Sequence, residues 1–489
     1  MKIEQILDIY VQQEESRLAS IRSLVTQVKS MANRTAGERV KFVEHPLGAF
    51  HLLKTYSKIS GEIARGENTK EDLSSALEAH SLSLPTHEDY IGSASAILRL
   101  QRIYELPKQE LMQGFVRDRF IQPLSIDDAL VLGAKAAEQH FFTQAIEWYD
   151  VPLRVPVEEE PMLANERIEA TLGLINVYLQ FNDFENALKF SRWAFETYSY
   201  DDRVRDVHAD VQRNIDALRF GKMEMPPPAN PAEFDEEYAA LCRGEVDWTN
   251  QYISQGHCIV RTDSVPYRLV KQEILSFDPF ISLFYDVLSE TEGNKFRNAA
   301  KENLYRAMVG NPSEAITSEV RVGQLTWLDD SEPSIKKISA RVMDITGLDV
   351  TMRTVQSSSE SFQIVNYGIG GHYEPHTDTY SNRSVLADVP DFLQNTGDRL
   401  ATFLFYLGDV VEGGSTVFPR VGIQVPVVKN GAAFWYNLNR AGENDERVTH
   451  AGCPVLLGQK WVANKWIREH GQEFRHGCGL TPTTPHHTS

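Results

Sequence analysis

Apolar positions near the start of the chain recur with the spacing of an amphipathic helix. The first stripe consists of Ile3, Ile6, Leu7, Tyr10, Ile21, Leu24, Val25, Val28 and Met31, and it predicts one long helix with an interruption around residues 14–17. Further helical patterns follow over residues 40–63 and 90–106. An ordinary helical bundle explains these segments. A long apolar seam on an N-terminal helix also needs a partner surface, which predicts pairing with its copy in a second chain.

A repeated pattern of small and aromatic residues follows from about residue 125 to 220. The set Gly133, Phe142 and Ala145 is echoed by Gly173, Phe184 and Ala187, with a period of about 42 residues. This pattern is similar to a tetratricopeptide repeat lengthened by an insertion over residues 151–161. Two such repeats and a capping helix would form a shallow groove suited to an extended peptide. A helical subdomain with its aromatic residues in the core is the alternative.

The periodicity changes after a proline-rich stretch at residues 223–231, which cannot continue a helix and predicts an extended linker. A helix over residues 334–347 has a glycine at its C-terminal cap. The other strong patterns are strand-like runs at residues 319–328, 361–367, 399–407, 432–438 and 460–467. Many short strands separated by glycine and proline turns predict an antiparallel sandwich or jelly roll.

Composition limits the possible partners of the chain. Its 489 residues predict two or three compact units. The net charge of -19 and the lack of a Lys/Arg stripe argue against nucleic-acid binding. We see no apolar run of about 20 residues, the length that spans a bilayer, so we expect a soluble chain. Residues 1–10 lack a signal-peptide pattern, which leaves a cytosolic protein or a mature chain whose leader has been removed.

A His-x-Asp pair followed by a distant histidine and lysine carries the candidate chemistry. His376 and Asp378 would project from one face of a strand, because alternate strand residues face the same way. With His450 they provide two imidazoles and one carboxylate, the facial triad of non-haem iron(II) oxygenases. Lys460 could reach a carboxylate inside the same barrel. Zinc also accepts His and Asp, but a structural zinc site would need four protein ligands and no cosubstrate lysine.

Four cysteines and two glycosylation sequons leave the cellular compartment open. The cysteines are too few for a disulfide scaffold, and a cytosolic protein would keep them reduced. Their positions favour the local pairs Cys242 with Cys258 and Cys453 with Cys478, although four cysteines allow three connectivities. Asn33 and Asn382 head open Asn-x-Ser/Thr sequons, tripeptides that also arise by chance.

Several motifs in the C-terminal half resemble the catalytic domain of the collagen prolyl 4-hydroxylase alpha subunit. They are residues 366–378 (NYGIGGHYEPHTD), 413–419 (GGSTVFP), 434–437 (FWYN), His450 and 458–461 (GQKW). The resemblance implies that His376, Asp378 and His450 bind Fe(II). It also implies that Lys460 binds the distal carboxylate of 2-oxoglutarate, that Tyr367 donates a hydrogen bond to this cosubstrate, and that O2 and L-ascorbate take part.

The order of regions is similar to the same family along nearly the whole chain, and it implies a multidomain α + β fold. We expect a helical, coiled-coil dimerisation region at residues 1–120 and a tetratricopeptide-like peptide-binding domain at 121–222. A Pro-rich linker at 223–245 would lead to the catalytic double-stranded β-helix (jelly roll) oxygenase domain at 246–489. The implied reaction hydroxylates C4 of peptidyl proline in procollagen-type sequences, and it decarboxylates 2-oxoglutarate to succinate and carbon dioxide.

The resemblance also implies partners and a location. Family members work in the endoplasmic reticulum lumen with protein disulfide isomerase as beta subunit, in an alpha2beta2 assembly, so an alpha–alpha dimer through the N-terminal helices and a removed signal peptide are expected. The family's two intrachain disulfides favour the two local cysteine pairs named above. A lid is expected at residues 379–398.

The residues that would bind the peptide substrate are the ones that match the family least. Relatives present a row of tyrosines to a proline-rich or collagen-like polypeptide, whereas the corresponding helix here carries Leu172, Ile175 and Tyr178, of which Tyr178 alone is aromatic. One alternative is therefore a related oxygenase that acts on a non-collagen proline-rich secreted protein. Another is a non-catalytic helical-repeat scaffold, against which the intact triad and Lys460 argue.

Overall fold

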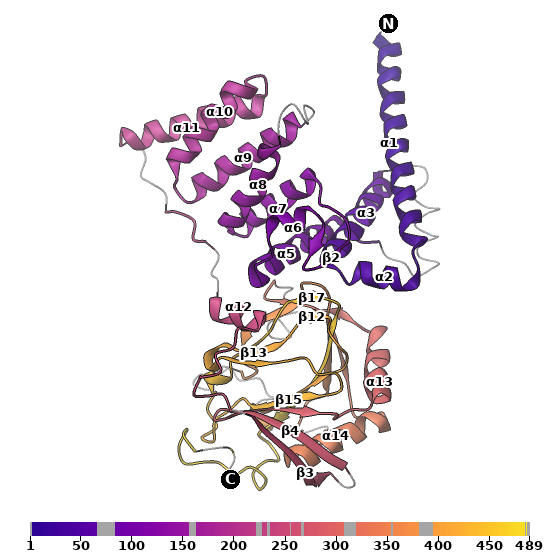
Figure 1. The fold of residues 1–489 in the computed structure, drawn as a ribbon, viewed down its shortest axis with the longest axis vertical. Helices are drawn as coiled ribbons and strands as arrows, with labels where there is room; N and C mark the ends of the chain where they lie inside the picture. The colour runs from indigo at the N-terminus through magenta and orange to yellow at the C-terminus, as the bar shows by residue number, and fades with distance from the viewer. Residues whose placement is uncertain are drawn as a thin grey trace. The chain divides into compact units, whose positions relative to one another are not determined.

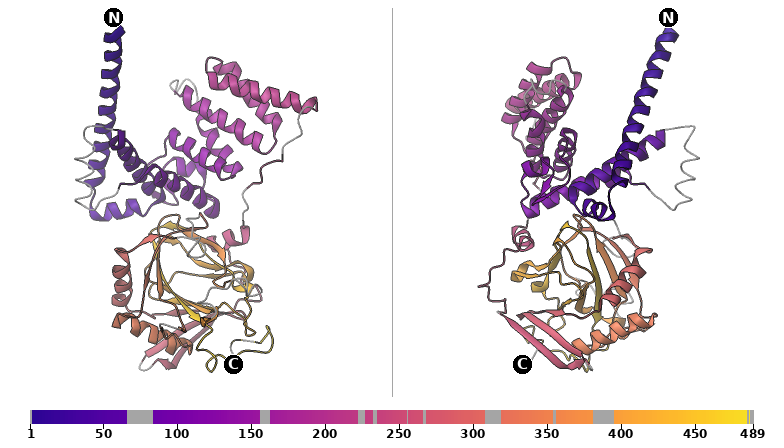
Figure 2. Two further views of the ribbon diagram at one scale, coloured as in Figure 1. Left: turned by 180° about the vertical axis from the view of Figure 1, so that it is seen from behind. Right: turned by 45° about the vertical axis from the view of Figure 1, so that its right-hand side comes forward.

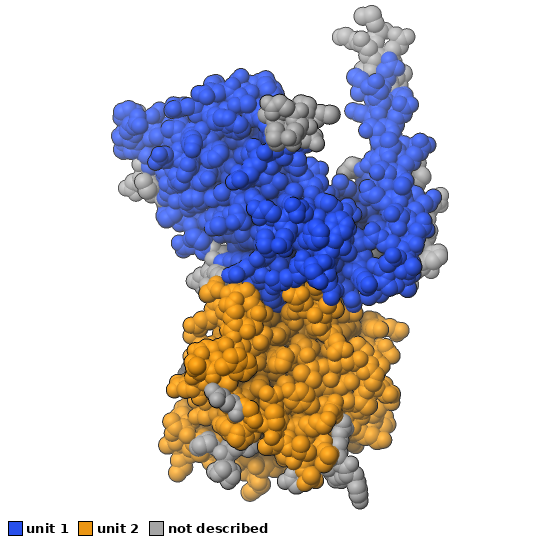
Figure 3. Space-filling view, viewed as in Figure 1, with its two compact units in different colours: residues 1–234 blue, residues 235–489 orange. Residues whose placement is uncertain are grey.

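The fold was determined as a computed structural model, in which the chain forms two compact units, Met1–Phe234 and Asp235–Ser489 (Figures 1 and 3). The structure describes residues 2–65, 84–155, 163–221, 227–231, 235–254, 256–265, 268–307, 319–353, 356–380, 395–484 and 486. Among the helices in these ranges, we find none with the length and hydrophobicity of a membrane-spanning segment.

The N-terminal helices follow the apolar stripes with two differences. Helix α1 (Lys2–Ala32) continues without a break, because Glu14 and Arg17 form an i,i+3 ion pair of 3.0 Å on its surface. The pattern at 40–63 forms two helices, α2 (Ala36–Val43) and α3 (Pro46–Arg65), since Pro46 starts a new helix after the turn. Helix α1 extends beyond the helices packed at its C-terminal end (Figure 2), and α5 (His87–Tyr104) packs on α3.

Five helices follow, and each packs against the next one along the chain. They are α7 (Ile126–Glu138), α8 (Phe142–Arg154), α9 (Ala164–Gln180), α10 (Phe184–Tyr198) and α11 (Asp202–Arg219). Before them, α6 (Lys108–Met112) leads into a small hairpin of β1 (Phe115–Val116) and β2 (Arg119–Phe120). The repeated glycines have a packing reason, because both lie against the ring of Tyr149. A Cβ atom would lie 2.9 Å from this ring at Gly133 and 2.3 Å from it at Gly173.

The proline-rich segment lies against the first unit where the structure describes it, at residues 227–231. The backbone N–H of Ala229 donates to the carbonyl of Gln180 at 2.7 Å, and His140 Nδ1 donates to the carbonyl of Asn230 at 3.1 Å. Residues 236–243, which we expected in the linker, form helix α12 (Glu236–Arg243) of the second unit. Asp235 caps this helix, and Gly244 ends it in the left-handed conformation with φ of 86°.

The second unit is built around two main antiparallel sheets. The larger has the order β3 (His257–Val265), β4 (Arg268–Phe277), β5 (Phe280–Tyr285), β15 (Ala432–Tyr436), β11 (Arg399–Tyr406), β18 (Lys460–Arg468), β9 (Phe362–Tyr367), β8 (Gln324–Leu328) and β6 (Tyr305–Arg306). The smaller has the order β14 (Ile423–Val425), β13 (Thr416–Phe418), β16 (His450–Gly452), β10 (His372–His376) and β7 (Arg321–Val322). A further pair joins β12 (Glu412–Gly413) to β17 (Val455–Leu457). These bounds confirm the expected strand runs, with residues 319–328 divided between β7 and β8.

The larger sheet separates two apolar layers. Its outer face packs on helices α13 (Glu290–Lys301) and α14 (Pro333–Thr346), the latter ending at Gly347 as the sequence predicts. Its inner face packs with residues of the smaller sheet. Along β15, Phe434 lies in the outer layer, whereas Trp435 lies in the inner one. Strand alternation therefore decides which side chains can reach a site between the sheets.

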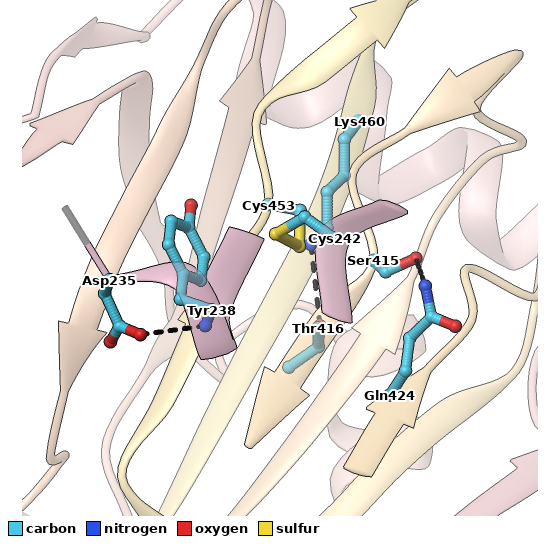
Figure 4. Close-up of a disulfide and its surroundings, with 8 residues drawn as sticks. All are labelled: Asp235, Tyr238, Cys242, Ser415, Thr416, Gln424, Cys453 and Lys460. Carbon is cyan, nitrogen blue, oxygen red and sulfur yellow. Dashed lines mark hydrogen bonds between the residues drawn. A yellow bond between two sulfur atoms is a disulfide. The ribbon is translucent and has the colours of Figure 1, made fainter. Parts of the chain in front are cut away.

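The disulfide pairing that we expected is wrong. Cys242 of α12 is bonded to Cys453, which follows β16 (Figure 4). Cys258 and Cys478 are free and exposed. Helix α12 packs on β13 and β14, which brings the two α-carbons to 5.5 Å although they are 211 residues apart. Cys258 lies on β3, at the edge of the other sheet. Distance along the chain was therefore a poor guide to distance in space.

We expect Gly173→Ala to destabilise the first unit, because the added methyl group must displace the buried Tyr149 ring. Overpacking of this kind lowers the free energy of unfolding by about 1–3 kcal/mol. Gly92→Ala is the matched control, since this glycine is exposed in α5 and a Cβ added there would meet nothing within 4 Å. The control should gain up to about 1 kcal/mol of helix propensity. Urea unfolding followed by circular dichroism at the helix band compares them, and equal shifts would contradict the packing argument.

Candidate metal and cosubstrate site

Strand register brings the two candidate histidines together. His376 ends β10 and is the direct cross-strand partner of His450, the first residue of β16. Asp378 follows two residues after His376. One ligand atom from each of the three side chains lies within 4.8 Å of the others, a separation that a single metal ion can span. The structure therefore gathers the His-x-Asp pair and the distant histidine as the sequence predicts.

The two imidazoles are oriented by backbone carbonyls. Nδ1 of His376 donates to the carbonyl of Glu374 at 2.8 Å, and Nδ1 of His450 donates to the carbonyl of Val448 at 3.1 Å. Their Nε2 atoms consequently carry the lone pairs, and they lie 3.9 and 3.6 Å from the Asp378 carboxylate. Burial and the neighbouring His450 lower the pKa of His376 to about 3. The His376 imidazole is thus neutral at physiological pH, which is the form that can bind a metal ion.

Asp378 is held ionised by the groups around it. Burial alone would raise the pKa of its carboxyl, but His450, His376 and Arg399 lower this pKa to about 2. Thr402 of β11 donates its hydroxyl to Asp378 Oδ2 at 2.6 Å, and Asn437 Nδ2 donates to that hydroxyl at 2.9 Å. Buried neighbours thus fix both the charge and the orientation of the third candidate ligand.

Arg399 connects Asp378 to a second buried carboxylate. Its guanidinium donates to both oxygens of Glu360, at 2.6 and 2.9 Å, and to the carbonyl of Asp378 at 3.2 Å. Arg468 NH2 lies 2.7 Å from the same Glu360 carboxylate. Two cations therefore surround Glu360. The charge of Arg399 also contributes to the lowered pKa of the Asp378 carboxyl.

The side-chain amine of Lys460 is buried in the same space between the two sheets. It is 3 % exposed, faces Tyr367 across the β18–β9 ladder, and its Nζ reaches the Thr416 hydroxyl at 3.5 Å (Figure 4). Within the described residues we find no carboxylate in ion-pair distance of it, and burial lowers its pKa to about 7. A buried amine of this kind fits a ligand that brings its own carboxylate.

A cavity of about 50 Å³ joins the triad to this lysine. Its lining is Arg321, Tyr367, Tyr373, His376, Asp378, Leu404, Thr416, Trp435, His450, Ala451, Gly452, Lys460, Val462, Asn464 and Trp466. Two imidazoles and a carboxylate fit a facial triad with open coordination positions, and the unpaired lysine fits the far end of a dicarboxylate. The donor set therefore suits iron(II) together with 2-oxoglutarate.

Several residues of this site were not predicted from the sequence. Thr402 gave one usable signal, a polar residue inside the apolar run of β11. Tyr373 stacks on the His376 ring with centroids 3.5 Å apart, and Arg321 lies 4.7 Å over the Tyr373 ring. Residues 319–328 were expected only as a strand, so Arg321 could be identified only once β7 was placed beside β10.

The remaining candidate residues lie elsewhere or outside the described residues. Ile175 is 1 % exposed and packs on Ala187 and Val211, so it is part of a core and not of an open face. Tyr178 is partly buried, and its ring stacks on Phe190 at 5.5 Å. Asn33 is exposed in the turn after α1. Asn382 and residues 381–394 of the expected lid lie outside the described residues.

Comparisons with known proteins find related families for both the N-terminal and the C-terminal part of the chain. Residues 2–118 match the family described as prolyl 4-hydroxylase alpha-subunit, N-terminal region, and residues 362–468 match the 2OG-Fe(II) oxygenase superfamily. Prolyl 4-hydroxylase subunit alpha-3 of Bos taurus is 33% identical over 98% of this chain and 91% of its own length. Prolyl 4-hydroxylase subunit alpha-2 of Gallus gallus is 32% identical over 98% of this chain and 92% of its own length. Subunit alpha-2 of Caenorhabditis elegans is 33% identical over 97% of this chain and 90% of its own length.

We expect Thr402→Val to weaken metal binding about 10–100-fold, because it removes the hydroxyl that orients Asp378. Thr326→Val is the matched control, since Thr326 is also buried but pairs with Ile364 on the outer face of the sheet. Calorimetric titration with Mn(II) measures both affinities. A Thr402→Val protein that binds Mn(II) as tightly as the control would contradict this role.

Proposed function

Since the chain belongs to the prolyl 4-hydroxylase alpha-subunit family, we propose that it hydroxylates C4 of peptidyl proline in procollagen-type sequences. The reaction converts 2-oxoglutarate to succinate and carbon dioxide. The observation that carries the proposal is one buried space that contains both a His-Asp-His set and an unpaired lysine.

His376, Asp378 and His450 would hold the iron, each through the atom that its neighbours leave available. The carbonyls of Glu374 and Val448 engage Nδ1 of the two histidines, so both would bind through Nε2. Thr402 engages Oδ2 of Asp378. Iron(II) supplies the redox centre for 2-oxoglutarate and O2, and L-ascorbate would keep it reduced.

Lys460 and Tyr367 would position the cosubstrate. The ammonium of Lys460 would pair with the distal carboxylate, a bond that also relieves the cost of burying an unpaired amine. Burial raises the pKa of Tyr367, so its hydroxyl keeps its proton and can donate to the same cosubstrate. Both residues come from adjacent strands in direct register.

We assign different functions to the regions of the two units. We assign residues 1–120 to dimerisation, 121–222 to a tetratricopeptide-like peptide-binding domain, and the double-stranded β-helix oxygenase domain to the unit that begins at Asp235. The paired helices α7–α11 and the two facing sheets support the two fold assignments. Ile9, Val11, Leu18 and Val25 of α1 are 45–55% exposed, which supports an alpha–alpha dimer through this helix.

Partners and location follow from the family in the same way. We propose that protein disulfide isomerase is the beta subunit of an alpha2beta2 assembly in the endoplasmic reticulum lumen, with Asn33 and Asn382 as glycosylation sites. The Cys242–Cys453 disulfide supports an oxidising compartment, because cytosolic thiols are normally kept reduced.

A non-collagen proline-rich secreted protein is a second candidate substrate. The burial of Ile175 favours it, since this position would have to be exposed to take part in an aromatic row for collagen-like peptides. Tyr178 remains the candidate peptide-binding residue of this helix, and its partly buried ring limits how much of it a peptide can contact.

The test is release of succinate coupled to 4-hydroxyproline in a peptide panel with iron and ascorbate. Pro-Pro-Gly repeats should be turned over, and His376→Ala should abolish both products, because it removes one candidate ligand. His257→Ala, an exposed histidine of β3, is the matched control that should keep full activity. Turnover on other proline-rich peptides alone would select the second substrate, and full activity of His376→Ala would refute the mechanism.

We also expect the binding of 2-oxoglutarate to weaken as pH rises. The pKa of Lys460 is lowered to about 7, so the amine loses its proton above this pH, whereas the distal carboxylate requires the ammonium form. The dissociation constant should therefore rise about tenfold per pH unit above about 7 and stay level just below it. Calorimetry with Mn(II) in place of iron measures it. Lys460→Ala should bind weakly at every pH, and an unchanged slope in this variant would assign the pH dependence to another group.

A further inference from the structure

Trp435 is a buried side chain next to the triad that the proposed chemistry has not yet used. It lies on the inner face of β15, is 1 % exposed, and lines the cavity between the sheets. Its ring centroid lies 4.6 Å from that of His450 and 5.3 Å from that of Phe418, at 59° and 81° to them. Packing on two sides therefore holds the indole in one orientation.

The indole N–H of Trp435 lacks a hydrogen-bond acceptor in the part of the chain that the structure describes, although it is buried. Two other buried indoles are satisfied, because Trp461 Nε1 donates to Gln459 at 3.0 Å and Trp148 Nε1 donates to Gln101 at 3.0 Å. Trp466 Nε1 also lacks an acceptor among the described residues, and this residue lines the same cavity. A buried donor without an acceptor is costly and rare in native folds.

The unsatisfied Trp435 N–H belongs to the end of the cavity that contains the His-Asp-His triad. Trp435 pairs with Thr402 across the β15–β11 ladder, and the Thr402 hydroxyl reaches Asp378. The ring also contacts His450. Lys460 belongs to the other end, since its Nζ lies near Thr416 and Gly452. A dicarboxylate held at one end by Lys460 would present its other carboxylate towards the triad and Trp435.

We propose that Trp435 Nε1 donates a hydrogen bond to the carboxylate of 2-oxoglutarate remote from Lys460. This inference rests on the proposed function. The indole then acts as a fixed neutral donor, which selects a keto acid with two carboxylates over one that keeps the distal carboxylate alone. A neutral donor suits this place because the positive charge of Arg399 already stabilises the ionised Asp378 carboxylate.

The test compares Trp435→Phe with the unsubstituted full-length protein, both loaded with Mn(II). Phenylalanine keeps a ring against His450 and Phe418 but removes the N–H. The dissociation constant of 2-oxoglutarate should rise about tenfold, the loss expected for one hydrogen bond to a charged acceptor. The dissociation constant of succinic semialdehyde, which retains the distal carboxylate and lacks the other, should stay within about twofold.

Trp461→Phe is the matched control, because it also removes a buried indole N–H but lies in the outer layer of the sheet. It should leave both dissociation constants unchanged. Lys460→Ala should weaken both ligands, since each carries the distal carboxylate. Misfolded protein lowers the binding stoichiometry and leaves the ratio of the two constants unaffected, so this ratio remains informative if Trp435→Phe folds poorly.

Two results would overturn the proposal. Unchanged affinity of Trp435→Phe for 2-oxoglutarate would show that the N–H does not bind it, and equal weakening of both ligands would show that the indole acts through the fold. Either result leaves the proposed function intact if the unsubstituted protein hydroxylates proline and His376→Ala does not. Failure of the unsubstituted protein to bind 2-oxoglutarate would refute both.

Discussion

The antiparallel register between β10 and β16 is the constraint on which the candidate site depends. His376 faces His450 because these two short strands pair at that position, and Asp378 can join them only if β10 ends there. A slip of one residue would turn a histidine to the opposite face of the sheet. The strands are only 5 and 3 residues long, so their neighbours must hold the register. Strands β13 and β7 do so by pairing along the outer edges of β16 and β10.

The charges between the sheets are compensated unequally. Asp378 and Glu360 have arginines, histidines or hydroxyls as neighbours, and their pKa values are lowered as a result. Lys460 is buried without an anion among the described residues, and its pKa moves in the direction that favours the neutral amine. The second unit therefore has one buried amine, that of Lys460, without a negative charge beside it among the described residues. A dicarboxylate ligand would supply that charge. Binding and folding stability should be coupled there.

The features that the sequence predicted well depend on local patterns. Runs of apolar residues bounded by glycine and proline located the main strands. The His-x-Asp spacing identified two residues that lie together, but only His376 is on a strand, because β10 ends there and Asp378 lies in the segment that follows. Features decided by contacts between distant segments were missed or wrong. Thr402 supports Asp378 from 24 residues away, and Ile175 is buried because α10 and α11 pack over it. Neither contact leaves a periodic signal. The break expected at residues 14–17 failed for another reason, since charged residues can form an ion pair along a continuous helix.

The 211 residues between Cys242 and Cys453 have a consequence for how the chain matures. During synthesis Cys242 is complete long before Cys453, whereas Cys258 follows it by about 16 residues. Closing the shorter loop is favoured by about 2 kcal/mol of chain entropy. The wrong partner is thus both earlier and entropically preferred. If Cys242 first pairs with Cys258, the native bond forms by thiol–disulfide exchange. In either case it closes only when β16 has brought Cys453 next to α12, which ties the completion of the covalent structure to the assembly of the strand that carries His450.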